Sequence, residues 1–307
     1  MSLFPFRRNI VKNLTIAAGA PGRSSLCTKL FAAIGIILCN LPKRFFAFSI
    51  DFCQKICYNS YTEMREMSTH YGRKEIPMRT KDVKLTLDIE TANTTEDALA
   101  YDVGFIVHHN DGTILEKHSY IIKEVFFGMA DLMQSAYYAH KIPEYLESIA
   151  KGERVVASAY EVRKILCDTI AKYNIKVVMA YNAAFDVKGL NTTQRYLTKS
   201  AYRWFLPYGI KVECIWHMAC QTICSQKKYY LFCVENGFVS KSGNISTSAE
   251  TVYRFLTDNP TFEEEHKGLE DVEIETAIFV ACRNKHKKMN RHINRACWRL
   301  AQRKEGK

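Results

Sequence analysis

The chain has 307 residues, of which 47% are hydrophobic and 24% are charged, a composition that is ordinary for a globular protein. This composition excludes a disordered tail protein and a collagen-like fibre. The length allows one large domain, or a domain of about 150 to 200 residues with additions.

The formal net charge of +11 is distributed unevenly. Residues 1–80 contain 12 Lys and Arg and 4 Asp and Glu (+8), and residues 281–307 contain 10 and 1 (+9). The segment between them contains the remaining 21 and 27 (−6). Basic ends usually meet phosphate on nucleic acid or on a membrane surface, and a solvated run of charge is the alternative.

The first 80 residues form a basic extension with no acidic residue before Asp51. Its longest apolar run, residues 30–41, is twelve residues long. Because a bilayer takes about 20 residues to span, we expect no transmembrane segment. The extension is either a leader peptide or a segment upstream of a later start at Met64, Met67 or Met78.

Eleven cysteines are scattered along the chain without the spacing of a secreted disulfide module. We therefore expect reduced thiols and a cytoplasmic protein. Within the segment CIWHMACQTIC, a zinc site built from Cys214, His217, Cys220 and Cys224 has to be weighed against simple burial. These residues share one apolar, helix-like segment instead of forming two separated pairs, so we favour buried thiols over a zinc-structured interaction site.

A strand with two neighbouring carboxylates is predicted from Val83 to Glu90, where apolar and polar residues alternate. This alternation is typical of a strand with one buried face, and Asp88 and Glu90 project from the same face. Side-by-side carboxylates repel each other unless a cation lies between them. Oxygen ligands favour Mg²⁺ or Mn²⁺ as that cation, and chance acids on a solvent-facing strand are the alternative.

The next elements continue this strand into a sheet. A hairpin turn at residues 110–112, NDG, joins two further strands at 101–109 and 113–122. A helix is predicted at 162–173, and the apolar strand 175–181 follows it. That strand leads to Asp186 at the start of another predicted helix, where α/β folds commonly place chemistry; a capping role is the alternative.

A late helix is predicted at 269–282 from its apolar spacing, and it contains Asp271. His266 precedes Asp271 by five residues, which is about 140° on a helical wheel. The two therefore share a face only if His266 lies on the loop that enters the helix. Residues 263–265, EEE, fit either the first turn of the helix or an acid-rich loop.

Residues 283–307 are predicted as a basic amphipathic C-terminal helix. Met289, Ile293, Ala296 and Leu300 recur at helical spacing, with arginines between them. Such a helix could bind a nucleic-acid backbone or dock on the body of the protein or on a partner.

The order of the acidic motifs is more specific than any one of them. Three motifs follow one another along the chain: Asp88-x-Glu90, Asn182-x3-Asp186 and His266-x4-Asp271. In this order, residues 81–282 resemble the DEDDh 3′-to-5′ exonucleases, the DnaQ-like group that includes polymerase proofreading subunits, ribonuclease T and oligoribonuclease. The resemblance implies an α/β, RNase H-like fold with a mixed five-stranded sheet flanked by helices.

The resemblance also implies the roles of individual residues. Four carboxylates would hold two divalent ions, Mg²⁺ or Mn²⁺, with Asp88 bridging them: Asp88, Glu90, Asp186 and Asp271. His266 would be the general base, and Thr91 and Asn182 would contact the substrate. The chain departs from the family pattern at Gly268, where Ala is usual, and in its extensions at both ends.

The predicted function is a two-metal-ion 3′-to-5′ exonuclease that releases nucleoside 5′-monophosphates from single-stranded nucleic acid, with DNA favoured over RNA. A replication or repair protein is its possible partner. The alternative is a catalytically silent nucleic-acid-binding or partner-recruiting module on the same fold. Because all five catalytic positions are filled, we favour the enzyme.

Overall fold

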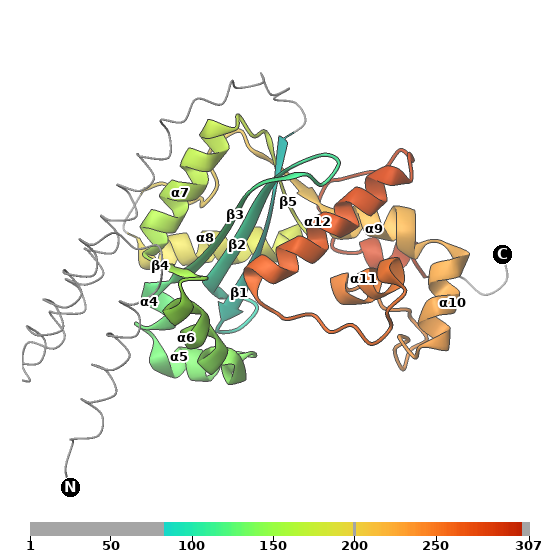
Figure 1. Cartoon of the computed structure of the whole chain (residues 1–307), viewed down its shortest axis with the longest axis horizontal. Coiled ribbons are helices and arrows are strands. Elements are labelled where there is room, and N and C mark those ends of the chain that lie inside the picture. Colours follow the sequence, from blue (N-terminus) through green and yellow to red (C-terminus); the bar gives the residue numbers. More distant parts are fainter. Residues whose placement is uncertain (1–82, 199–200, 303–307) are drawn as a thin grey trace, which may run out of the picture. The chain divides into compact units, whose positions relative to one another are not determined.

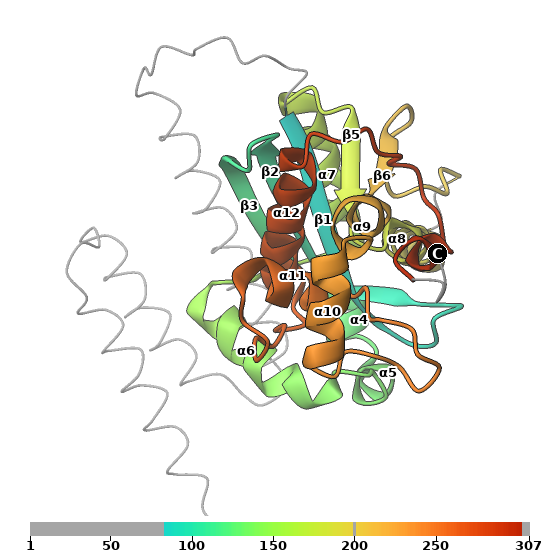
Figure 2. The same ribbon diagram turned by 90° about the vertical axis from the view of Figure 1, so that its right-hand side faces the viewer.

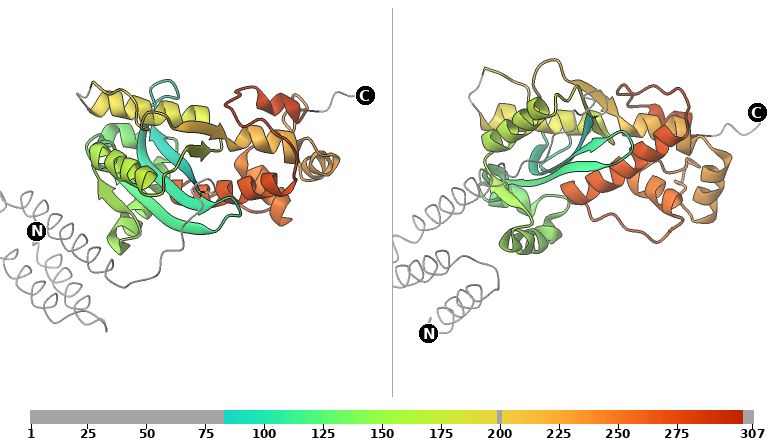
Figure 3. Two further views of the ribbon diagram at one scale, coloured as in Figure 1. Left: turned by 90° about the horizontal axis from the view of Figure 1, so that it is seen from above. Right: turned by 45° about the horizontal axis from the view of Figure 1, so that its top comes forward.

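The computed structural model describes residues 83–198 and 201–302. They form a mixed α/β fold in which helices cover both faces of a six-stranded sheet (Figures 1 and 3). The predictions for residues 1–80 lie outside the described residues. In the part of the chain that is described, no helix is both long enough and apolar enough to span a bilayer.

The sheet has the strand order β4-β3-β2-β1-β5-β6. Its strands are β1 (Val83–Ala92), β2 (Leu99–His109), β3 (Ile114–Ile122), β4 (Val155–Ala157), β5 (Val177–Ala180) and β6 (Lys211–Cys214). The first three form the predicted antiparallel meander, and β4, β5 and β6 add in parallel. The sheet therefore has one strand more than the five that the resemblance implies, and the sequence did not indicate β4 and β6, which have three and four residues and are too short to show a period-two pattern.

The predicted helices at 162–173, at Asp186 and at 269–282 are all present, and the fold contains further helices that were not predicted. The α-helices are α4 (Lys123–Phe126), α5 (Ala130–Gln134), α6 (Ile142–Lys151), α7 (Ala159–Lys172), α8 (Ala183–Leu197), α9 (Ile215–Ala219), α10 (Lys227–Glu235), α11 (Ala249–Thr257) and α12 (Gly268–Asn284). Short turns of other helix types are η3 (Ala139–Lys141), η4 (Cys220–Cys224) and η5 (Cys297–Leu300). Helix α7 begins before its apolar pattern because Ser158 and Glu161 form a capping box.

Strand β1 is buried on both faces, whereas the sequence predicted one buried face. On one face, Leu87 joins a hydrophobic core that includes Leu190 of α8. On the other, Thr86 is fully buried, and its Oγ1 lies 2.8 Å from Nε2 of His108. The His108 ring packs edge-on against Phe279 of α12, which covers this face (Figure 2). The carboxylates of β1 therefore project into the interior, toward α12.

Helix α12 and strand β2 approach so closely that no side chain fits between Gly104 and Gly268. A Cβ on Gly104 would lie 2.2 Å from the carbonyl carbon of Gly268, and a Cβ on Gly268 would lie 2.8 Å from the Gly104 nitrogen. The buried Asp102 carboxylate accepts hydrogen bonds from the Gly268 N–H (3.0 Å) and the Tyr145 hydroxyl (2.9 Å). Alanine, usual at the position of Gly268 in the resembled family, would collide here with the backbone of β2.

Residues 285–302 do not form the predicted amphipathic helix. His286, just after the end of α12, has a left-handed φ of 51°. From there the chain continues without regular structure to η5. The carbonyl oxygens of Arg291 and His292 accept hydrogen bonds from the Cys214 N–H (2.7 Å) and from Nδ1 of His217 (2.8 Å). These tertiary bonds occupy backbone groups that a helix would use, so they override the local apolar spacing.

The glycine contact leads to a test of stability. Gly104→Ala should lower the free energy of unfolding by about 3 kcal/mol, because its methyl group overlaps the backbone of α12. Gly152→Ala is the control, since a Cβ there meets open space, although φ is +77°; it should cost about 1 kcal/mol. Urea denaturation measures both, and an equal loss in the two variants would contradict the close contact.

Candidate active site

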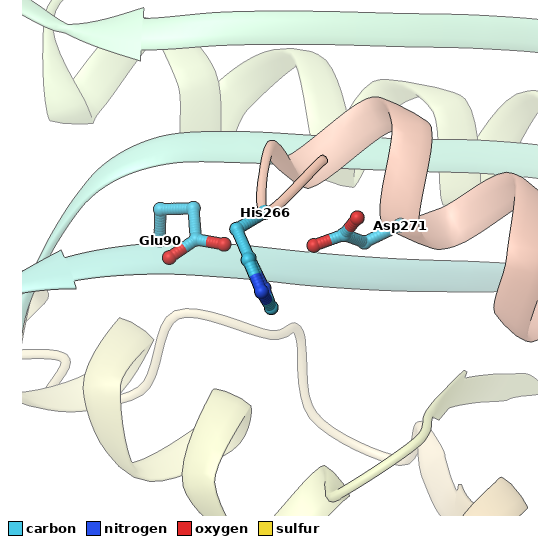
Figure 4. Close-up of side chains that lie close together, drawn as sticks. All are labelled: Glu90, His266 and Asp271. Atoms are coloured by element: carbon cyan, nitrogen blue, oxygen red, sulfur yellow. The ribbon is translucent and has the colours of Figure 1, made fainter. Parts of the chain in front are cut away.

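Three potential metal ligands converge at one end of β1 (Figure 4). They are Glu90 of β1, His266 of the loop before α12, and Asp271 in the first turn of α12. One ligand atom from each lies within 4.8 Å of the other two. His266 precedes the helix, as its spacing from Asp271 required, and its φ of 48° is in the left-handed region that β-carbon-bearing residues rarely occupy. The backbone conformation thus turns the imidazole toward the two carboxylates.

Two more of the predicted carboxylates adjoin this group. Asp88 lies two residues before Glu90 on the same face of β1, and Asp186 is buried in the first turn of α8. Asp186 lies close enough to Asp88 for its negative charge to raise the pKa of Asp88. Asp186 is not a helix cap, because Asn182 occupies the cap position.

Burial raises the pKa of each of these carboxyl groups. Desolvation is the largest cause in every case, and it brings the pKa of Glu90 to about 9, that of Asp271 to about 8 and that of Asp186 to about 7. The pKa of Asp88 is raised well above its ordinary value, by burial first and then by repulsion from neighbouring carboxylates. Such a cluster is costly at neutral pH unless protons or cations neutralise it.

The donor set fits hard divalent cations. It consists of carboxylate oxygens and one imidazole, and Oδ1 of Asp271 is buried with no hydrogen-bond partner among the described residues. A buried carboxylate oxygen without a donor is suited to a metal ion. Lys141 is a cation whose charge lowers the pKa of both Glu90 and Asp271, but one positive charge cannot balance the group.

Two side chains that the sequence did not indicate pack at His266. The Tyr138 ring stacks on the imidazole with a centroid distance of 4.5 Å and an interplanar angle of 16°. Lys141 donates a hydrogen bond to the backbone oxygen of Glu265, and its Nζ lies 5.6 Å from the centroid of the Tyr138 ring. Burial, and then the charge of Lys141, lower the pKa of His266 and favour its neutral form. Neither residue belongs to a motif, so no sequence signal marked them.

A fifth carboxylate, Glu275, lies outside the sequence motifs and was not predicted as a site residue. It is 4% exposed and lies one helical turn after Asp271 on α12. Residues four apart on a helix are separated by about 40° around the axis and share a face. The spacing from Asp271 was therefore a usable signal.

The two predicted substrate residues lie beside the carboxylates. Thr91 is half-buried and follows Glu90 at a break in the β1–β2 register. Asn182 is exposed, and its side chain makes no capping hydrogen bond at the start of α8. Their contacts with substrate stay predictions.

The cysteine segment does not assemble a metal centre. Cys214, Cys220 and Cys224 are free and buried, which confirms the prediction of buried thiols, and His217 is committed to the carbonyl of His292. Over residues 83–198 and 201–302, three or more potential ligands converge at Glu90, His266 and Asp271 and not at these cysteines.

No family model matches the chain, and no curated protein matches it. Among solved structures, it is similar to E. coli exonuclease I in complex with a dA16 oligonucleotide, with 12% identity and a TM-score of 0.39. It is also similar to the zinc ion bound form of the E. coli exonuclease I complex with single-stranded DNA, with 12% identity and a TM-score of 0.38. Each match covers 64% of this chain and 39% of the other. Likeness at this level carries no functional argument.

The raised pKa values predict how pH affects the metal-free protein. Glu90, Asp186 and Asp271 keep their protons to higher pH when folded than when unfolded. Their contribution to stability is therefore fully present below about pH 4 and is lost as pH rises toward about 9. In EDTA, the Tm should fall between pH 5 and pH 8, and Mn²⁺ should offset the fall.

The matched control for this measurement is Asp271→Asn, which removes one titrating group at nearly constant shape. Its Tm in EDTA should depend less steeply on pH than that of the parent protein. Identical pH dependence in the two proteins would contradict a raised pKa at Asp271.

Proposed function

We propose that this protein is a two-metal-ion 3′-to-5′ exonuclease of the DEDDh type, with an RNase H-like fold, that degrades single-stranded DNA in preference to RNA. The observation that carries the proposal is the convergence of Glu90, His266 and Asp271 near Asp88 and Asp186, two carboxylates close enough for their charges to interact. The products would be nucleoside 5′-monophosphates. Cytoplasmic location and a replication or repair partner stay predictions.

The side chains of the site would have separate roles in phosphodiester hydrolysis. Four carboxylates would hold two Mg²⁺ or Mn²⁺ ions: Asp88, Glu90, Asp186 and Asp271. The chemistry that such ions supply is stabilisation of negative charge on the attacking and leaving oxygens. Neutral His266 accepts the proton of the attacking water, and Tyr138 keeps its ring in place. Thr91 and Asn182 would position the terminal nucleotide.

Substitution of the site tests this function. Asp88→Ala and His266→Ala should each lower kcat at least about 100-fold, through loss of metal retention and of the general base respectively. The measurement is degradation of matched 5′-labelled single-stranded DNA and RNA with Mg²⁺, and shortening should proceed from the 3′ end. Asp168→Ala, a substitution at an exposed ion pair on α7, is the control.

The outcome also separates the two candidate functions. Activity that survives in Asp88→Ala would end the proposal. A parent protein that binds single strands but degrades neither would be the silent nucleic-acid-binding module.

The C-terminal segment supports capture of a phosphate backbone. Residues 283–299 contain seven Lys and Arg and no acidic residue. Of these seven cations, Arg291 has an ion pair within the described chain, with Glu213 at 3.5 Å. Lys188 lowers the pKa of Glu96, in the β1–β2 connection, and Arg295 lowers it more weakly. The exposed cations at residues 285–288 follow the C-terminal end of α12, whereas Asp271 lies in the first turn of that helix, so the proposed strip would contact the substrate away from the carboxylates.

Neutralising part of this strip tests the capture role. Deletion of the whole C-terminal segment is unsuitable as a test, because Cys297 and Ala301 are buried and their loss would damage the core. Lys287→Gln with Lys288→Gln should weaken binding to single-stranded oligonucleotides and reduce the slope of log affinity against log salt by about 1. Turnover of a dinucleotide should stay unchanged.

A second pair of lysines provides the charge-matched control. Lys227→Gln with Lys228→Gln removes two exposed positive charges from α10 and should leave the salt dependence nearly intact. Equal effects of the two double substitutions would show that net charge, and not the C-terminal strip, governs binding.

A further inference from the structure

Glu275 joins α12 to the turn that carries Asp186. Its Oε2 accepts a hydrogen bond from the backbone N–H of Tyr181 at 3.0 Å. Tyr181 is the first residue after β5, and its carbonyl oxygen accepts hydrogen bonds from the Trp216 N–H (2.8 Å) and the Cys214 thiol (3.2 Å). Hydrogen bonds therefore fix the peptide groups on both sides of Tyr181, and α8 starts two residues later.

The register of the sheet places this contact next to the predicted metal ligands. In the parallel pair of β1 and β5, Leu85 is opposite Val178 and Thr86 is opposite Met179. Continuing this register brings Asp88 level with Tyr181 on the adjacent strand, about 5 Å away across the sheet. The carboxylate of Glu275, bound to the Tyr181 N–H, thus lies at the level of Asp88.

The charge of Glu275 acts on the same group of carboxylates. Glu275 is 4% exposed and faces three other acids, Asp186, Asp271 and Glu264. Asp88 is also close enough for its charge to interact with that of Glu275. No basic side chain forms an ion pair with Glu275 within the described residues. The unpartnered Oδ1 of Asp271, one turn earlier on the helix, faces the same interior.

We infer that Glu275 is a positioning residue of the site that also adds a fifth negative charge for retaining divalent cations. It fixes the β5–α8 turn, and through it the carboxylate of Asp186, while its charge attracts the ions that the four motif carboxylates bind. This inference rests on the proposed two-metal site. It extends that site by one residue outside the sequence motifs.

Two substitutions separate the two contributions of Glu275. Glu275→Gln keeps an oxygen that can accept from the Tyr181 N–H but removes the charge. It should fold normally, and its affinity for Mn²⁺, measured by calorimetric titration, should fall at least about tenfold. Glu275→Ala also leaves the Tyr181 N–H without an acceptor, so it should lose Mn²⁺ affinity and show a lower Tm in EDTA than Glu275→Gln.

Glu273→Gln is the control, because this exposed residue two positions earlier on α12 is paired with Lys117 and should bind Mn²⁺ like the parent protein. Mn²⁺ affinity in Glu275→Gln within twofold of the parent would overturn the inference, provided that Asp271→Asn reduces it. If Asp271→Asn also binds Mn²⁺ normally, the proposed function itself fails. Loss of Mn²⁺ binding in both Glu275→Gln and Asp271→Asn, with the control unchanged, is the expected result.

Discussion

The contact between Gly104 and Gly268 is the constraint on which the geometry of the site depends. It brings the backbone of α12 against β2 with no side chain between them. Asp271 lies three residues after Gly268 and His266 two residues before it, while Glu90 lies on the strand next to β2. A larger spacing between helix and sheet would separate these ligands. Asp102, fully buried, holds the first turn of the helix in place.

Burial of several carboxylates at one end of the sheet opposes folding in the absence of cations. Desolvation and mutual repulsion favour protonated or metal-bound forms, so the charged, metal-free state is strained. Two hydrophobic cores, and the hydrogen bond of Asp102 to the first turn of α12, offset this cost. Glu275 increases the repulsion and at the same time fixes Tyr181. The same arrangement that destabilises the empty site would make it retain divalent ions.

Acidic and basic groups are separated in space as well as along the chain. The site carboxylates are buried apart from Asp88, which is half-buried, and the lysines and arginines at residues 285–299 are half-buried or exposed, where they can meet phosphates. The C-terminal segment stays on the body through backbone hydrogen bonds to α9 and its neighbours, which leaves its charged side chains in solvent. Under the proposed function, the acidic site and the basic strip would bind different parts of one substrate.

The sequence by itself determined the elements that carry the motif residues. Period-two alternation located β1, the NDG turn located the hairpin, and apolar spacing located α12 with His266 before it, because these signals arise from neighbours in the chain. Tertiary structure alone decided that the polar face of β1 is covered as well, that Tyr138 packs on His266, and that the C-terminal segment is irregular. These features depend on contacts between distant residues, such as Arg291 with Cys214, and no local pattern encodes them. Glu275 lies between the two cases: its helical spacing was visible in the sequence, but its bond to Tyr181 exists only in the folded chain.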